Sequence, residues 1–105
     1  MKSISIIIPA YNEENVIEKT VKSYLDFFKA KKLDFEIIIV PNNCKDNTPE
    51  IALNLSKRFK EVKCKNIPDN VGKGGAVLEG FKLAKKELLC YLDADNSTKP
   101  EMIWK

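Results

Sequence analysis

The amino-acid sequence predicts an α/β protein with a doubly wound, mainly parallel sheet. Short runs of β-branched residues alternate along the chain with longer segments whose apolar residues recur at helical spacing. Most of these runs are apolar at nearly every position, which is typical of strands buried on both faces of a sheet. Strands that alternate with helices in this way imply right-handed crossovers and therefore parallel neighbours.

The first half of the chain contains two strand–helix units. Residues 3–9 and residues 35–40 are runs rich in isoleucine, and a proline closes each run. We expect a helix over residues 12–31, with Asn12 as its N-cap and acidic residues in its first turn. We expect a second helix to begin with Thr48 as its cap, followed by a first-turn proline.

The second half adds two strands and one helix. Residues 62–67 alternate weakly between apolar residues and lysines, which suits a strand near the edge of the sheet. The glycine-rich residues 72–75 open a third helix, and residues 88–92 form a fourth apolar run that ends at Asp93. The predicted order of elements is βαβαβαβ.

Composition excludes several classes of protein. The 105 residues suit one globular domain. The 18 basic residues exceed the 15 acidic ones by only three and are scattered, so we expect no nucleic-acid partner. Three cysteines without a histidine indicate neither a disulfide framework nor a zinc site.

The expected location follows from the same composition. The apolar runs fall short of the roughly 20 residues that a membrane helix needs, so we expect no membrane span. The cysteine usage favours a reducing compartment. We therefore expect a cytoplasmic protein, at most associated with the cytoplasmic face of a membrane.

Three polar strand exits are expected to meet at one edge of the sheet. They are residues 9–13, residues 41–46 and residues 93–95. In open parallel sheets, ligands bind outside the carboxyl ends of the strands. The sequence therefore predicts one ligand site built from these exits.

Asp93 and Asp95 are the sharpest chemical signal at this edge. Two carboxylates spaced i and i+2 after a strand can point to the same side, with the small Ala94 between them. A divalent cation with oxygen ligands, Mg²⁺ or Mn²⁺, relieves their repulsion. The alternative is a solvated turn that caps a following helix. The position at a strand exit favours the metal site.

The remaining candidates allow two interpretations each. Lys73 lies in a glycine-rich segment that is either a flexible turn or a loop bringing backbone and lysine to a phosphate at a helix N-terminus. Tyr11 can lie near a base, whereas Asn12 and Glu14 are typical of helix capping. Asn42 and its neighbours are typical turn residues.

Four segments together carry a resemblance to a known family. Residues 5–14, 36–40, 70–76 and 92–95 resemble, in this order, the motifs of the GT-A family 2 glycosyltransferases. The glycine-rich segment and residues 93–100 look most like the dolichyl-phosphate glucosyl- and mannosyltransferase branch. The resemblance covers nearly the whole chain. It implies the Rossmann-like N-terminal half of a GT-A domain.

The resemblance also implies site residues and chemistry. The nucleoside pocket would be lined by Pro9, Ala10, Tyr11 and Glu13. Asp93 would contact the nucleotide, Asp95 would hold Mg²⁺ or Mn²⁺ on the diphosphate, and Lys73 would lie beside the nucleotide. The implied reaction is an inverting transfer from a UDP- or GDP-sugar to an acceptor such as a polyprenyl phosphate. An acceptor phosphate is already anionic, so it needs no strong catalytic base.

Two departures from the family pattern matter. The usual Asp-Asp-Gly-Ser after the second strand is here Pro41-Asn42-Asn43-Cys44, and the neutral Asn42 amide can both accept from a base and donate to it. The identity of the base therefore stays open. The family also continues beyond the last residue, Lys105, with an acceptor-binding part in which we expect the catalytic residues.

Residues 1–105 are therefore expected to be the nucleotide-sugar-binding portion of such a domain. We expect an exposed apolar surface that includes Ile103 and Trp104, and hence either a homodimer or aggregation. One alternative is a non-catalytic nucleotide-binding fragment. Another is a receiver-type phosphoacceptor domain, but that class would need an acidic pair where Pro9 and Ala10 follow the first strand.

Overall fold

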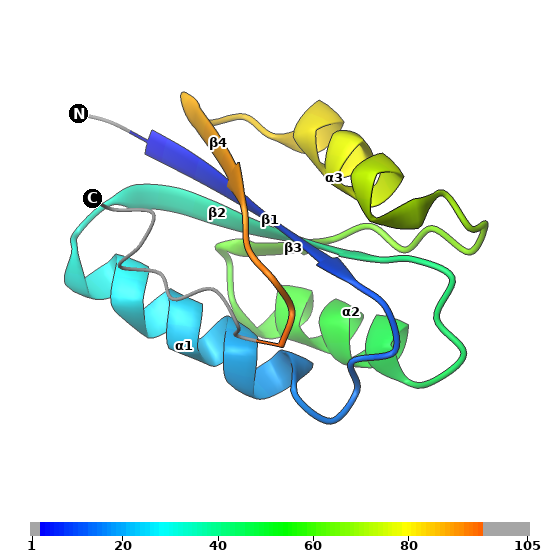
Figure 1. The fold of residues 1–105 in the computed structure, drawn as a ribbon. Coiled ribbons are helices and arrows are strands. Elements are labelled where there is room, and N and C mark those ends of the chain that lie inside the picture. Colours follow the sequence, from blue (N-terminus) through cyan, green and yellow to red (C-terminus); the bar gives the residue numbers. More distant parts are fainter. Residues whose placement is uncertain (1–2, 96–105) are drawn as a thin grey trace.

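The computed structural model describes residues 3–95 and contains one four-stranded sheet in that range (Figure 1). The elements in chain order are β1 (Ser3–Ala10), α1 (Ile17–Ala30), β2 (Asp34–Pro41), α2 (Thr48–Arg58), β3 (Val62–Cys64), α3 (Gly72–Leu83) and β4 (Leu88–Tyr91). The strand order is β3-β2-β1-β4, and every neighbouring pair is parallel. The predicted α/β class and element order are confirmed.

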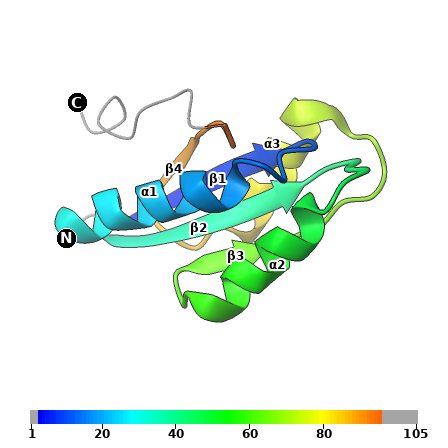
Figure 2. The same ribbon diagram turned by 90° about the horizontal axis from the view of Figure 1, so that it is seen from below.

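Helices cover both faces of the sheet. Helices α1 and α2 lie on one face and α3 lies on the other (Figures 1 and 2). Successive residues of β1 alternate between the two cores, so Ile6 packs with α1 while Ile7 packs with α3. Both isoleucines are fully buried, as the continuous apolar run predicts.

Helix α3 packs very close to the sheet at Gly80. A Cβ atom at this position would lie 2.5 Å from Cγ2 of Ile7, so only glycine fits without a shift of the helix. This contact allows α3 to pack at a short distance from β1. It thereby helps to fix the N-terminus of α3 at the carboxyl edge of the sheet.

Two predicted helix caps are wrong. Helix α1 begins at Ile17, and Asn12 instead adopts a left-handed backbone with φ of +52°. Helix α2 begins at Thr48 itself, with Asn47 in the cap position and no side-chain cap. Both predicted caps bond to the other strand exit instead, because these two loops lie side by side.

The two outer strands are shorter than predicted. Strand β3 ends at Cys64, and Ile67 forms only an isolated bridge with Asn42. Strand β4 ends at Tyr91 and lies at an edge of the described sheet, with Leu88, Leu89 and Tyr91 about half exposed. The sheet is therefore best covered in its centre, at β1 and β2.

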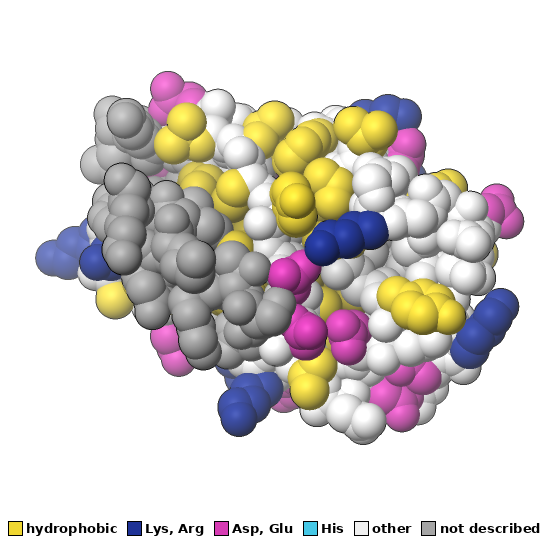
Figure 3. Space-filling model, in the orientation of Figure 1, with side chains coloured by type: hydrophobic (Ala, Val, Ile, Leu, Met, Phe, Trp, Pro, Cys, Tyr) yellow, Lys and Arg dark blue, Asp and Glu magenta, His cyan; other side chains and the backbone are white. Residues whose placement is uncertain are grey.

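Part of the expected apolar surface is visible. Hydrophobic side chains gather over β4 and α3 in Figure 3. The exposed apolar residues that these two elements carry include Leu78, Leu88 and Leu89. The two residues named for this surface, Ile103 and Trp104, lie outside the described residues. Residues 3–95 contain no helix with the length and apolar character of a membrane span. The homodimer stays a prediction.

Candidate functional site

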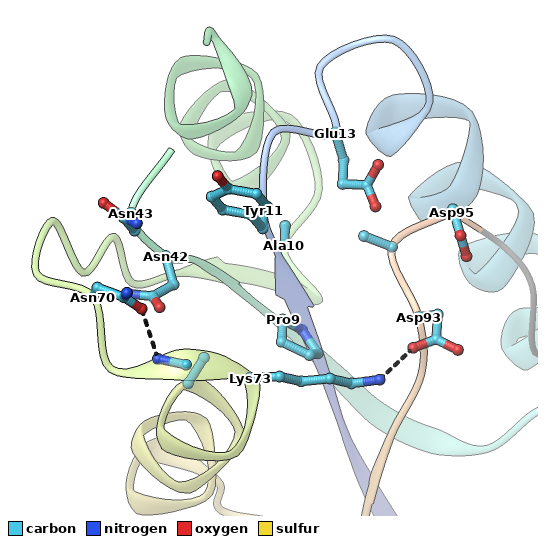
Figure 4. A pocket seen from close by; sticks show the side chains of 13 residues that line it. Pro9, Ala10, Tyr11, Glu13, Asn42, Asn43, Asn70, Lys73, Asp93 and Asp95 are labelled. Carbon is cyan, nitrogen blue, oxygen red and sulfur yellow. Dashed lines mark hydrogen bonds and ion pairs between the residues drawn. The ribbon is translucent and has the colours of Figure 1, made fainter. Parts of the chain in front are cut away.

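One pocket of about 440 Å³ lies where β1, β2 and β4 end and α3 begins (Figure 4). The residues predicted from the sequence that line it are Pro9, Ala10, Tyr11, Glu13, Asn42, Lys73, Asp93 and Asp95. All the predicted site residues are thus brought together. The pocket also contains Asn43 and Asn70, which were not predicted as site residues.

A set of reciprocal hydrogen bonds joins the exits of β1 and β2. Side-chain oxygens of Asn12 and Glu14 accept from the backbone N–H groups of Lys45 and Asn47, at 2.7 and 2.8 Å. In the other direction, Thr48 Oγ1 accepts from the Glu13 N–H at 2.8 Å. The polar residues of these two loops therefore form the frame that holds Glu13 beside the pocket.

Asp46 connects the same frame to α2. One of its carboxylate oxygens accepts from the Glu14 N–H at 3.1 Å, and the other accepts from the Thr48 hydroxyl and N–H at 2.6 and 3.0 Å. Burial alone would raise the pKa of Asp46, but these hydrogen bonds outweigh it and the pKa is lowered. Asp46 is thus held ionised as part of the frame.

Acidic side chains occupy one half of the pocket. Glu13, Asp93 and Asp95 line it from two strand exits, and acidic groups gather at the middle of the face in Figure 3. The pKa of Glu13 is raised, first by burial and then by the negative charges of Asp95, Asp46 and Asp93. These carboxylates therefore lie close enough to repel one another, and a cation between them would relieve that repulsion.

The donor set fits a hard divalent cation that shares its ligands with a substrate. No cluster of three or more metal-ligating side chains is found within the described residues. Mg²⁺, however, usually binds through one or two carboxylates, substrate phosphates and water. Asp93 and Asp95 match this type of site, since both are oxygen donors that open into a pocket.

Lys73 supplies a positive charge at the border of the acidic half. Its Nζ donates to Asp93 Oδ1 at 2.9 Å and lies 5.5 Å from the centre of the Tyr91 ring (Figure 4). The hydrogen bond to Asp93 is the main reason that the pKa of Lys73 is raised. The ammonium group is therefore charged and partly neutralises Asp93.

Tyr24 of α1 holds the residue at the exit of β4 from the α1 side of the sheet. The side chain is fully buried, and its hydroxyl donates to the backbone oxygen of Asp93 at 3.1 Å. Burial, followed by the charges of Asp93 and Asp95, raises the pKa of Tyr24 to about 12. The helical spacing of apolar residues marks Tyr24 as a core position, but it carries no sign of a partner 69 residues further along the chain.

Amide side chains occupy the other half of the pocket. Asn42 is buried, and its amide nitrogen donates to the backbone oxygens of Ile67 and Asp69 at 2.9 and 2.6 Å. Its Oδ1 accepts from the Val71 N–H at 3.3 Å. Both amide hydrogens are thus bonded to backbone oxygens of the protein. Asn70 Oδ1 accepts from the Gly72 N–H at 3.2 Å (Figure 4).

These features define a class: a doubly wound α/β domain with a ligand pocket at the carboxyl edge of its sheet and charged groups of both signs around it. The family follows from the sequence match. Residues 5–105 match the model of glycosyl transferase family 2, and the chain belongs to that family.

Similar curated proteins support the assignment to the family. The chain is 38% identical over 101 residues to the dolichyl-phosphate beta-glucosyltransferase ALG5A of Trichomonas vaginalis, covering 91% of this chain and 31% of that protein. It is 33% identical over 107 residues to the human dolichyl-phosphate beta-glucosyltransferase, covering 93% and 32%. The chain thus spans about a third of the length of these relatives.

Solved structures confirm the fold. S. aureus TarS 1-349 in complex with UDP superposes with a TM-score of 0.73 at 28% identity, covering 90% of this chain and 28% of that one. The mannosyltransferase PcManGT from Pyrobaculum calidifontis in complex with GDP-Man and Mn²⁺ gives a TM-score of 0.74 at 23% identity, covering 88% and 27%. The predicted GT-A architecture is therefore confirmed.

Proposed function

We propose that this chain supplies the donor site of a glycosyltransferase that moves a sugar from a nucleotide-diphosphate sugar to an acceptor. The observation that carries the proposal is the pocket in which Asp93, Asp95 and Lys73 converge beside Tyr11. A carboxylate pair and an ammonium group match a metal-bound diphosphate, and an exposed aromatic ring beside them matches a base. Relatives named as dolichyl-phosphate beta-glucosyltransferases favour a polyprenyl phosphate as the acceptor.

Different residues of the pocket would bind different parts of the donor. Tyr11 is 60% exposed and offers its ring to the base, next to Pro9 and Ala10. Asp95, together with Asp93, would hold Mg²⁺ or Mn²⁺. When bound, such a cation supplies positive charge to the departing diphosphate. Lys73 adds a further charge for the same phosphates. Transfer with inversion, at the cytoplasmic face of a membrane, belongs to the same proposal.

A calorimetric titration tests the donor site. We expect UDP- or GDP-sugars to bind the chain in the presence of Mn²⁺ and to bind much more weakly after chelation with EDTA. The comparison of the two nucleotides identifies the base. Binding that is equally tight with and without the metal would contradict the metal site. A turnover assay with a polyprenyl phosphate then separates a complete transferase from a binding fragment.

Lys73→Met is expected to change metal and nucleotide binding in opposite directions. Removing the ammonium frees Asp93 Oδ1 from a 2.9 Å hydrogen bond, so Mn²⁺ alone binds several-fold more tightly. The phosphates lose a charged donor, so the nucleotide diphosphate in saturating Mn²⁺ binds about tenfold more weakly, a loss of about 1.4 kcal/mol. Calorimetry with each ligand measures both effects.

Lys82→Met is the matched control for this variant. Lys82 also lies on α3 and also pairs with an acid, Glu79, at 2.7 Å, but it does not line the pocket. Both affinities should stay at the unaltered values. If Lys73→Met weakened Mn²⁺ binding as well, the idea that Lys73 and the metal compete for the Asp93 carboxylate would be wrong.

A further inference from the structure

We infer that Asn42 is a positioning residue whose amide holds the 67–71 loop, and through it the amide half of the pocket, in its binding geometry. The inference rests on the proposed function for its binding readout. It assigns Asn42 a role different from reading the base directly. In this chain the three partners of the side chain match an amide, and a carboxylate of the same shape would lack the donors that two of them need.

Backbone hydrogen bonds attach the 67–71 loop to the sheet only at its first residue, Ile67, among the described residues. Backbone hydrogen bonds from Asn43 N–H to the Ile67 oxygen (3.0 Å) and from Ile67 N–H to the Pro41 oxygen (2.9 Å) extend the edge of the sheet by one bridge. Among the described residues this backbone ladder stops at Ile67. From there to the start of α3, the chain depends on side chains for its attachment to the sheet.

The Asn42 side chain supplies that attachment. It bonds to Asp69 and Val71, the two residues that flank Asn70, as well as to Ile67. Asn70 lines the pocket, and its side-chain oxygen accepts from the Gly72 N–H. Gly72 is the first residue of α3 and has a φ of +76°. Lys73 comes next in the chain. The buried Asn42 amide therefore holds the residues on both sides of Asn70, which in turn bonds to Gly72, the residue before Lys73.

The chemistry of the partners demands an amide. Two of the three groups around the Asn42 side chain are carbonyl oxygens, which need a donor, and the third is an N–H, which needs an acceptor. An amide offers two donors and an acceptor, whereas an ionised carboxylate offers only acceptors. A carboxylate here would place a negative charge 2.6 to 2.9 Å from the two carbonyl oxygens. The loop would be pushed away from β2.

The test compares Asn42→Asp and Asn42→Ala with Asn66→Asp. Asn66 is exposed and precedes the same loop, so its change adds the same charge without touching the Asn42 contacts. Backbone hydrogen exchange of Val71 reports the loop, and calorimetry with UDP or GDP in saturating Mn²⁺ reports the pocket. Each variant is compared with the unaltered chain at the same pH.

We expect Val71 to exchange at least tenfold faster in both Asn42 variants and unchanged in Asn66→Asp. At pH 7.5, Asn42→Asp should weaken nucleotide binding by tenfold or more, and by more than Asn42→Ala. Near pH 5 the introduced carboxyl gains a proton and can donate one hydrogen bond. At that pH, Asn42→Asp should therefore bind the nucleotide more tightly than Asn42→Ala does. A role in packing alone would not produce this reversal of order.

Two outcomes overturn the inference. One is unchanged Val71 exchange in Asn42→Ala, which folds without any introduced charge. The other is nucleotide binding by Asn42→Asp that stays at the unaltered level, or that fails to recover at low pH relative to Asn42→Ala. If the unaltered chain binds no nucleotide, the proposed function fails instead, while the Val71 exchange still decides whether the amide holds the loop.

Discussion

Asp95→Ala is expected to weaken the Mn²⁺-dependent binding of a nucleotide-diphosphate sugar by about 100-fold, or about 2.7 kcal/mol. The reason is electrostatic. Asp95 adds to the negative charge around Glu13, and a diphosphate can enter this half of the pocket only if a cation screens it from the carboxylates. With one carboxylate removed, Asp93 remains, and Lys73 already bonds to it. The divalent cation then loses one of the two carboxylates proposed to hold it.

The control for this prediction is Asp26→Ala. Asp26 is an exposed residue of α1 outside the pocket, so the same change of charge and side-chain size should leave the affinity at the unaltered level. Calorimetry in Mn²⁺ and in EDTA measures the metal-dependent part for each chain. Equal affinity of Asp95→Ala and the unaltered chain in Mn²⁺ would show that the metal lies elsewhere or plays no part.

The sequence predicts the fold and the location of the pocket because both depend on a repeating pattern. Residues such as Ile6 and Ile7 are buried on opposite faces, and a continuous apolar run like theirs is typical of a central strand. Parallel strands place all their carboxyl ends at one edge, so the exits carrying Tyr11 and Asp93 had to meet there. Neither step requires knowledge of individual contacts.

The polar contacts of the site could not be predicted in the same way. Asn12 and Thr48 have the residue types of helix caps, and their true partners lie 33 and 35 residues away. Asn42 has the type of a turn residue, yet its side chain holds a loop that begins 25 residues later. A polar side chain carries no periodicity, so its type limits the kind of bond it makes without indicating the partner.

Glu36→Gln is expected to lower the free energy of unfolding by about 2 to 4 kcal/mol, a large part of the 5 to 15 kcal/mol typical of a domain. The carboxylate is buried at the other end of the sheet from the pocket. It accepts from Ser5 Oγ (2.6 Å), Lys63 Nζ (2.6 Å) and Lys85 N–H (2.7 Å). These bonds tie β1, β2 and β3 to the segment that leads into β4.

Glutamine keeps the shape of this side chain but turns one acceptor into a donor. The Lys63 ammonium loses its counter-charge. The new N–H₂ group faces either Lys63, which bonds to Oε1, or both Ser5 and Lys85, which share Oε2. Glu87→Gln is the matched control, since Glu87 is exposed in the segment that leads into β4. Denaturant unfolding should give an unchanged slope and a lower midpoint for Glu36→Gln alone. A midpoint like that of the control would contradict the structural role of Glu36.

The same network predicts how the stability depends on pH. Burial would raise the pKa of Glu36, but the hydrogen bonds from Lys63, Ser5 and Lys85 outweigh it, so the folded pKa is lowered. The unfolded chain therefore binds a proton first, at about pH 4.3. The contribution of Glu36 is complete above that value and is lost as the pH falls through the folded pKa. The difference in unfolding free energy between the unaltered chain and Glu36→Gln should consequently be constant from pH 8 to about 5.5 and shrink on further acidification. A difference that grew on acidification would mean that Glu36 is protonated in the folded chain.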